Sequence, residues 1–265
     1  MSLALYVSVP IVCSGVVLGC IAAVYLQPSW VMRVVVRLSH PSVLWCANTT
    51  SPICSLTIDD APSDTTPLLL DLLKQYNVKA TFFVISSQIP GHEDTMRRIV
   101  REGHVIGNHL TENRASIMYE LPVFEQKLLE CDNAIRAFQS HDGDEWVSID
   151  QQDDATEAAA TAFYTAATAR RHKWMRPGAG LFTSKMREIV TKHGYRICIG
   201  TVYPHDTRVK SESVNAAYLR RRTRAGSVII VHDRAWTVSV LRAALPDLIQ
   251  SFEFVSLDDL AQHNE

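Results

Sequence analysis

Apolar and polar positions alternate from residue 55 onward with periods that predict strands and helices in turn. Leu56 and Ile58 lie two residues apart in the run 55–58, which predicts a half-buried strand. Leucine spacing predicts a helix over residues 66–76, and the aromatic and β-branched run 80–85 predicts a buried strand. Further strands are expected at 104–107, 174–177, 196–201, 228–231 and 252–255, and further helices at 93–103, 121–138, 185–193 and 239–251.

Residues 140–155 interrupt this alternation with Asp, Gly and Gln, and are expected to form a loop before an alanine-rich helix that ends at Arg171. The sequence contains no GxGxxG motif and no visible internal repeat. Alternating β and α units without a nucleotide-binding motif predict an α/β domain built as a barrel or as a wound sheet.

The N-terminal segment differs in kind, because residues 3–26 contain no ionisable side chain except tyrosine. A run of about 20 apolar residues can cross a bilayer as a helix. No basic region precedes the segment and no A-x-A site follows it, so we predict an uncleaved anchor rather than a signal peptide. Residues 27–45 are expected to form a short interfacial helix. The predicted domains are a membrane anchor with its juxtamembrane segment, 1–44, and a catalytic domain, 45–265.

The side of the membrane that the catalytic domain faces stays open. Arg33 and Arg37 follow the apolar segment and favour a cytoplasmic domain. The glycosylation sequon at Asn48 can be used only in a eukaryotic lumen, and it lies between Cys46 and Cys54, which are close enough in sequence to form a disulfide.

Composition limits the function classes without selecting one. The chain has 265 residues, 47% hydrophobic and 20% charged, which suits one sizeable domain. Its formal net charge is -2, from 26 basic and 28 acidic residues, and it carries no nucleic-acid recognition motif. We therefore expect no nucleic-acid partner.

Polar side chains follow the predicted strands at the points where these strands end. In a (β/α) barrel the carboxyl ends of all strands open onto one face, so residues that are distant in sequence converge there. Singly, each of these residues is more often a cap or turn residue than a ligand; Asp60, for example, would then cap the next helix. The residues are Asp59 and Asp60, His109 and Asn113, Arg176, His205 and Asp206, and His232 and Asp233.

These residue types suit one kind of chemistry. A carboxylate, an imidazole and one more oxygen or nitrogen ligand bind a divalent metal and leave positions for water and substrate. A second carboxylate can take a proton from the attacking water, and a histidine on another strand can protonate the leaving amine. An arginine next to the base fixes its orientation. Together they predict metal-assisted hydrolysis of an amide or ester.

Five motifs in order, TIDDAP, GNHLTEN, RPGAG, YPHD and IIVHD, give the chain a resemblance to the polysaccharide deacetylases (carbohydrate esterase family 4, the NodB homology domain). The resemblance covers about residues 53–260. It implies a distorted (β/α) barrel and a zinc-type metal enzyme that removes N-acetyl groups from chitin-like or peptidoglycan-like sugars. By position, it implies that Asp59 is the general base, that His232 is the general acid and that Arg176 orients the base. It also places the backbone N–H near Ala179 at the oxyanion.

The same resemblance implies Asp60 and His109 as metal ligands, with Asn113 where the family pattern has a second histidine. An amide oxygen is a weaker ligand than imidazole, so we expect one divalent metal, zinc with cobalt or manganese as alternatives, held less tightly. YPHD replaces an acidic motif, which leaves His205 and Asp206 as expected substrate-binding residues. RPGAG lacks the aromatic residue that usually precedes its final glycine.

Three functions are consistent with the sequence. The first is an N-acetyl hydrolase acting on an amino sugar polymer or glycoconjugate. The second is a deformylase or other C–N hydrolase of a lipid-linked sugar, which the predicted anchor suits. The third is an inactive carbohydrate-binding relative; Asn113 supports it, whereas retention of Asp59, Asp60, Arg176 and His232 argues against it.

Overall fold

The computed structural model describes residues 19, 27–139 and 173–263. The chain divides into two compact units, Met1–Pro41 and Ser42–Glu265. The predicted membrane segment 3–26 lies outside the described residues apart from Gly19, as do the loop and alanine-rich helix expected between 140 and 171. Within the described ranges no helix is both long and apolar enough to cross a bilayer. The first unit contains the helix α2, Ser29–Leu38, where a short interfacial helix was predicted.

The described strands of the second unit form one parallel sheet in the order β1-β6-β5-β4-β3-β2-β7, with β8 paired to β2. The predicted parallel α/β fold is therefore confirmed. The strands are β1 Val43–Leu44, β2 Ile53–Ala61, β3 Ala80–Val84, β4 Val105–Asn108, β5 Lys173–Met175, β6 Tyr195–Cys198, β7 Val228–His232 and β8 Glu253–Phe254.

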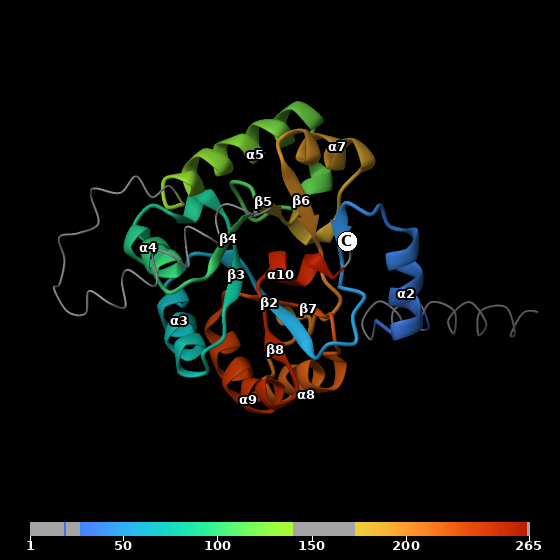
Figure 1. Ribbon diagram of the computed structural model, residues 1–265. Helices are drawn as coiled ribbons and strands as arrows, with labels where there is room; N and C mark the ends of the chain where they lie inside the picture. The colour runs from blue at the N-terminus through green and yellow to red at the C-terminus, as the bar shows by residue number, and fades with distance from the viewer. Residues whose placement is uncertain (1–18, 20–26, 140–172, 264–265) are drawn as a thin grey trace, which may run out of the picture. The chain divides into compact units, whose positions relative to one another are not determined.

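Helices surround the sheet of the second unit in Figure 1, in the βα order that the sequence predicts. Short 3₁₀ turns follow β3, β4 and β5 at the carboxyl edge: η1 Ser86–Gln88, η2 Ser116–Met118 and η3 Gly178–Gly180. The helices are α3 Thr66–Gln75, α4 Glu93–Arg101, α5 Leu121–Arg136, α7 Ser184–Lys192, α8 Glu212–Arg222, α9 Ala235–Ser251 and α10 Leu257–Gln262.

The sheet curls until its two ends meet. Val202, which follows β6, forms a parallel bridge with Ile229 of β7, and Cys46, which follows β1, forms an antiparallel bridge with Ser227. The backbone N–H of Ile230 donates to the carbonyl of Val202 at 2.8 Å. β7, at one end of the strand order, therefore contacts the segments that follow β6 and β1 at the other end.

The strand β2 is fully buried, so the expectation of a half-buried strand is wrong. Leu56 and Ile58 pack into the main apolar core, and Ser55 and Thr57 between them are equally buried. The Thr57 hydroxyl donates to the carbonyl of Ile229 at 2.6 Å. A parallel strand in the middle of a sheet is covered on both faces, and its small hydroxyls can be satisfied by backbone carbonyls.

Other differences from the sequence expectations are local. The helix α8 was not predicted, because only Ala216 and Leu219 form its buried apolar face. The helix α9 starts at Ala235, four residues before the expected position. Cys54 is a buried free thiol, and burial raises its pKa to about 12, so the disulfide that Cys46 and Cys54 could have formed is absent.

Candidate active site

The two carboxylates at the end of β2 do not follow the alternation of an ordinary strand. Asp59 lies in register with His232 of β7 and with Phe83 of β3, but a β-bulge separates it from Ala61. Asp60 sits in this bulge with a φ of 63°, a region that non-glycine residues rarely adopt. The bulge re-aims the Asp60 carboxylate, and the two neighbouring acids make separate sets of contacts at one end of the sheet.

Asp59 is held by a buried arginine. The Nη1 atom of Arg176, which follows β5, donates to Oδ1 of Asp59 at 2.6 Å and to the Thr57 hydroxyl at 2.7 Å. Its Nε donates to the carbonyl of Cys198 at 3.0 Å, and its guanidinium lies 4.2 Å from the centre of the Phe83 ring. Burial opposes the charge, but Asp59 outweighs it and the pKa of Arg176 is raised. These contacts fix Oδ1 of Asp59 and leave Oδ2 for another partner.

Asp60 faces His109 from the next turn of the site. The Nδ1 atom of His109 lies 2.6 Å from the carbonyl of Arg176, so it donates this hydrogen bond and leaves a lone pair on Nε2. This Nε2 is 3.5 Å from Oδ1 of Asp60, and both side chains are buried. Burial alone would raise the pKa of Asp60, but the hydrogen bond and charge of His109, with the charges of His232 and Arg234, lower it to about 2. Asp60 is therefore a carboxylate at neutral pH.

Two further side chains hold the other oxygen of Asp60. Asn113 donates from Nδ2 to Oδ2 at 2.9 Å, and Arg234 donates from Nη2 to the same oxygen at 2.5 Å. Arg234 also donates from Nη1 to the carbonyl of Asp233 at 2.7 Å. Sequence reasoning placed Asn113 but missed Arg234, although a basic residue directly after IIVHD was a visible signal.

His232 at the end of β7 is oriented by Asp206. Asp206 accepts the backbone N–H of His232 at 2.7 Å and lies 2.9 Å from its Nδ1. Burial disfavours the charged imidazole, but Asp206, with Asp59 and Asp60, outweighs burial and raises the pKa of His232. Asp206 was predicted to bind substrate; here it is completely buried and its carboxylate is engaged by His232. The nitrogen that His232 can present to a substrate is therefore Nε2.

His205 lies next to this pair without joining it. Its φ of 57° turns the chain before Asp206, and its ring lies 4.4 Å from that of Tyr203. The Tyr203 ring in turn lies 5.6 Å from that of His232. The segment thus supplies two aromatic rings beside the histidine, one of which, Tyr203, was not assigned to the site from sequence.

Ala179 lies on the exposed turn η3, with a φ of 57°. The preceding Gly178 donates its N–H to the Ser116 hydroxyl at 2.8 Å, which ties η3 to the loop that carries Asn113. A Cβ atom at Gly178 would lie 2.0 Å from the carbonyl oxygen of Arg114, so only glycine allows this close approach. The two loops are therefore packed together at one side of the site.

Asp233 fits the alternative of a structural strand-end residue. Its carboxylate accepts a hydrogen bond from the Thr66 hydroxyl at the start of α3, and burial raises its pKa. Asp60, by contrast, does not cap that helix, whose N-cap residue is Thr65. Only one of the two expected bland roles at these positions is present.

The donor set was tested against a divalent cation. Among the described residues no three His, Cys, Asp or Glu side chains are grouped so that they could hold a metal ion. Oδ1 of Asp60 and the lone pair of His109 Nε2 nevertheless face each other in a buried position, the arrangement that two ligands of a divalent cation require. The carbonyl that accepts from Nδ1 of His109 fixes the tautomer, as is usual for metal-binding histidines. Two ligands fit, with Asn113 as the third.

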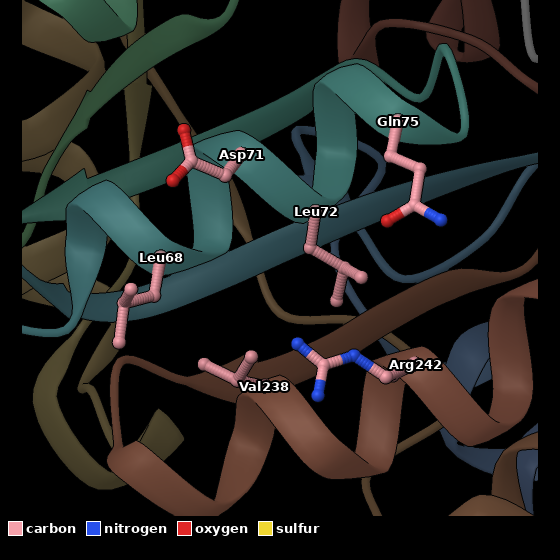
Figure 2. A pocket seen from close by; sticks show the side chains of 6 residues that line it. All are labelled: Leu68, Asp71, Leu72, Gln75, Val238 and Arg242. Carbon is pink, nitrogen blue, oxygen red and sulfur yellow. The ribbon is translucent and has the colours of Figure 1, made fainter.

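A pocket of about 180 Å³ between α3 and α9 is separate from this site. Figure 2 shows that its walls are helix side chains, apolar from Leu68, Leu72 and Val238 and polar from Arg242. Asp71 in this pocket is paired with Arg98 at 2.5 Å. The pocket shares no residue with the candidate active site.

Comparison with known proteins defines the class that this fold and site represent. The sequence profile of the family "Polysaccharide deacetylase" matches residues 47–198, which is more than half of the chain. The chain belongs to the polysaccharide deacetylase family, as the five motifs suggested.

Individual relatives are more distant. A peptidoglycan-N-acetylglucosamine deacetylase of Bacillus cereus is 24% identical over 235 residues, covering 83% of this chain and 93% of that protein. The peptidoglycan-N-acetylglucosamine deacetylase PgdA of Listeria monocytogenes is 26% identical over 209 residues; the match covers 78% of this chain but 38% of PgdA. The crystal structure of the Bc1960 peptidoglycan N-acetylglucosamine deacetylase has a TM-score of 0.68 at 23% identity, covering 83% of this chain and 93% of that chain. At this identity the structural likeness concerns the fold.

Proposed function

We propose that this chain is a metal-dependent hydrolase that removes N-acetyl groups from an amino sugar polymer or glycoconjugate. The observation that carries the proposal is the pairing of a buried base and a buried acid on neighbouring strands. Asp59 and His232 are register partners of β2 and β7, and each has its own orienting partner, Arg176 and Asp206. Such an arrangement exceeds what strand packing requires, since it buries two charged pairs.

Asp59 acts as the general base. Because Arg176 occupies Oδ1, the proton of the attacking water passes to Oδ2. Arg176 makes its other hydrogen bonds to the Thr57 hydroxyl and to a backbone carbonyl, so its position does not depend on Asp59 alone. The base is thereby held in one orientation throughout the reaction.

His232 acts as the general acid. With Nδ1 bound to Asp206, its Nε2–H is the proton donor for the leaving nitrogen when the ring is protonated. The raised pKa of His232 keeps a larger share of the ring protonated near neutral pH than an isolated histidine would have. The backbone N–H near Ala179 is proposed to bind the oxyanion, because η3 turns there toward the loop of Ser116.

Asp60 and His109 are proposed to hold one divalent metal, with Asn113 as an additional oxygen ligand. Zinc suits a carboxylate and an imidazole, and cobalt or manganese are the alternatives. A divalent cation held there would polarise the amide carbonyl and help to activate water. His109 is preorganised for this role by its hydrogen bond to Arg176, whose side chain orients Asp59.

The substrate class rests on the relatives. Both sequence relatives are named for deacetylation of N-acetylglucosamine in peptidoglycan, which supports an N-acetylated sugar as the substrate of this chain. A lipid-linked sugar acted on by a deformylase or other C–N hydrolase is the second candidate, favoured by the apolar segment 3–26. An inactive carbohydrate-binding protein is the third, favoured by Asn113 in place of a histidine ligand.

We further propose that residues 3–26 anchor the protein in a membrane and that α2 lies at the bilayer surface. Trp30, Val34 and Leu38 are exposed and four residues apart, so they share one face of α2, and Arg33 and Arg37 can reach lipid phosphates. We also interpret the sheet as a distorted barrel, because the segments after β1 and β6 both pair with β7. A glycan mapped at Asn48 would place the catalytic domain in a lumen.

The proposed function is tested with the full chain purified in detergent and loaded with zinc. N-acetylglucosamine oligomers and peptidoglycan fragments are incubated with it, and released acetate is measured before and after chelation and metal return. Acetate release that disappears with the chelator and returns with zinc is expected. A fully loaded protein that hydrolyses no N-acyl sugar would contradict the proposal.

A further inference from the structure

We propose that Arg234 is a built-in counter-cation of Asp60 that competes with the divalent metal, so that metal binding requires Arg234 to leave the carboxylate. The inference rests on the proposed metal site at Asp60 and His109. It assigns a role to a residue that the chemistry of hydrolysis does not use. It predicts a site that takes up its metal weakly and exchanges it readily.

The contacts of Asp60 support this competition. Its Oδ2 already accepts hydrogen bonds from Arg234 at 2.5 Å and from Asn113 at 2.9 Å. Only Oδ1, facing His109, lacks a donor of this strength. A charge-assisted bond of this length is among the stronger protein hydrogen bonds, so a cation that takes over Asp60 must offset its loss.

The charges of the site point the same way. Each carboxylate at the end of β2 has its own guanidinium: Arg176 on Asp59 and Arg234 on Asp60. A metal ion at Asp60 and His109 would thus meet an aspartate whose charge is already balanced. Moving Arg234 away restores the negative charge and removes a repulsive neighbour of the cation.

Burial shows which partner can move. The side chain of Asp60 is 3% exposed, whereas that of Arg234 is 29% exposed. Arg176, at 3%, is locked under the sheet by three further contacts to Thr57, Cys198 and Phe83. Arg234 holds on the protein side only the carbonyl of its neighbour Asp233 besides Asp60. Arg234 can therefore swing into solvent when a metal arrives, and Arg176 cannot.

The competition makes opposite predictions for the two states of the protein. Without metal, Arg234 compensates a buried charge, so Arg234→Gln should lower the thermal midpoint. With metal, the cation compensates Asp60, and the same variant should be free of the cost of displacing the arginine. The apparent dissociation constant for zinc or cobalt should then fall by about 10- to 100-fold, the scale on which groups around metal ligands act. Arg234→Lys, which keeps the charge, should lie between wild type and Arg234→Gln.

The experiment measures zinc and cobalt dissociation constants of the full chain by competition with a chromogenic chelator, alongside thermal midpoints with and without metal. Arg98→Gln is the matched control, because Arg98 also donates to an aspartate, Asp71, at 2.5 Å but outside the site. The expected result is tighter metal binding and a larger metal-induced rise of the midpoint for Arg234→Gln alone.

An unchanged dissociation constant for Arg234→Gln, or a shift of equal size for Arg98→Gln, would overturn the inference. If Arg234→Gln does not fold without metal, the constant of Arg234→Lys decides: it must fall below that of wild type. Absence of hydrolysis by the metal-loaded wild type would count against the proposed function and leave this comparison of metal affinities standing. The two failures are thus distinguishable.

Discussion

Two clusters at the end of β2 are built to different standards. The Asp59 cluster is buried, and each of its acid–base groups has one orienting partner; the Asp60 cluster is partly exposed, and its key carboxylate is shared among a histidine, an amide and an arginine. The difference teaches that the proton-transfer groups of this site are preorganised, whereas its metal position is contested. The Asp59 cluster comprises Asp59, Arg176, His232 and Asp206, and the Asp60 cluster comprises Asp60, His109, Asn113 and Arg234.

The backbone explains this difference. In the Asp59 cluster, Asp59 and His232 are strand residues whose register is fixed by the β2–β7 ladder. In the Asp60 cluster, Asp60 sits in a bulge, and Asn113 and Arg234 lie on segments that follow strands. Strands position side chains more rigidly than loops do, so we expect the first cluster to set turnover and the second to set metal affinity.

The largest expected effect concerns the acid of the Asp59 cluster. His232→Ala should reduce turnover by about 10²- to 10⁴-fold, the usual contribution of a general acid, while metal content stays at the wild-type level. Steady-state hydrolysis of N-acetylglucosamine oligomers with metal analysis of each sample measures this. Wild-type turnover in His232→Ala would remove His232 from the mechanism.

The next effect concerns the stability of the same cluster. Arg176→Met leaves Asp59 as a buried charge without its partner, so the free energy of unfolding should fall by about 3–5 kcal/mol. Arg98→Met is the control: Asp71 on its partner side is exposed, and the loss should stay below about 1 kcal/mol. Urea unfolding of the metal-free proteins compares the two, and equal losses would show that Arg176 is not the tightly coupled partner described here.

A smaller effect would sharpen the Asp60 cluster. Asn113→His replaces an amide by an imidazole within reach of Asp60 and should tighten zinc binding by about tenfold, since imidazole is the better zinc ligand. Asn113→Gln keeps the amide and serves as the control. Chelator competition gives both constants; no gain for Asn113→His would place position 113 outside the metal site.

The smallest change is a shift in pH dependence. Asp206 helps to raise the pKa of His232, so Asp206→Asn should move the alkaline limb of the rate profile to lower pH. The sign for stability agrees: a raised pKa contributes stability that is present below the unfolded-state pKa and is lost as pH rises through the folded-state value. Asp206→Asn should therefore flatten this loss as well. An alkaline limb at its wild-type position would contradict the role of Asp206.

The sequence located most of this site for a simple reason. Residues that follow parallel strands share one edge of the sheet, so Asp59, His109, Arg176 and His232 could be placed together before their contacts were known. The parallel α/β class followed from the alternation of periods in the same way. Both inferences use only local pattern and topology.

What could not be predicted depends on long-range geometry. The ion pair of Asp60 with Arg234 joins residues 174 positions apart and needs the bulge and positive φ at Asp60. The bond between Asp206 and His232 needs the left-handed turn at His205. The expectation that Asp59 and Asp60 point to opposite faces of a regular strand is wrong for the same reason, because alternation does not hold across a bulge.

One measurement tests the division of labour between the two clusters most directly: metal content and turnover determined together for Asp59→Asn and Asp60→Ala. The account predicts that Asp59→Asn keeps its metal and loses about 10²- to 10⁴-fold in turnover, while Asp60→Ala loses both metal and turnover. Stoichiometric metal in Asp60→Ala, or loss of the metal in Asp59→Asn, would contradict it.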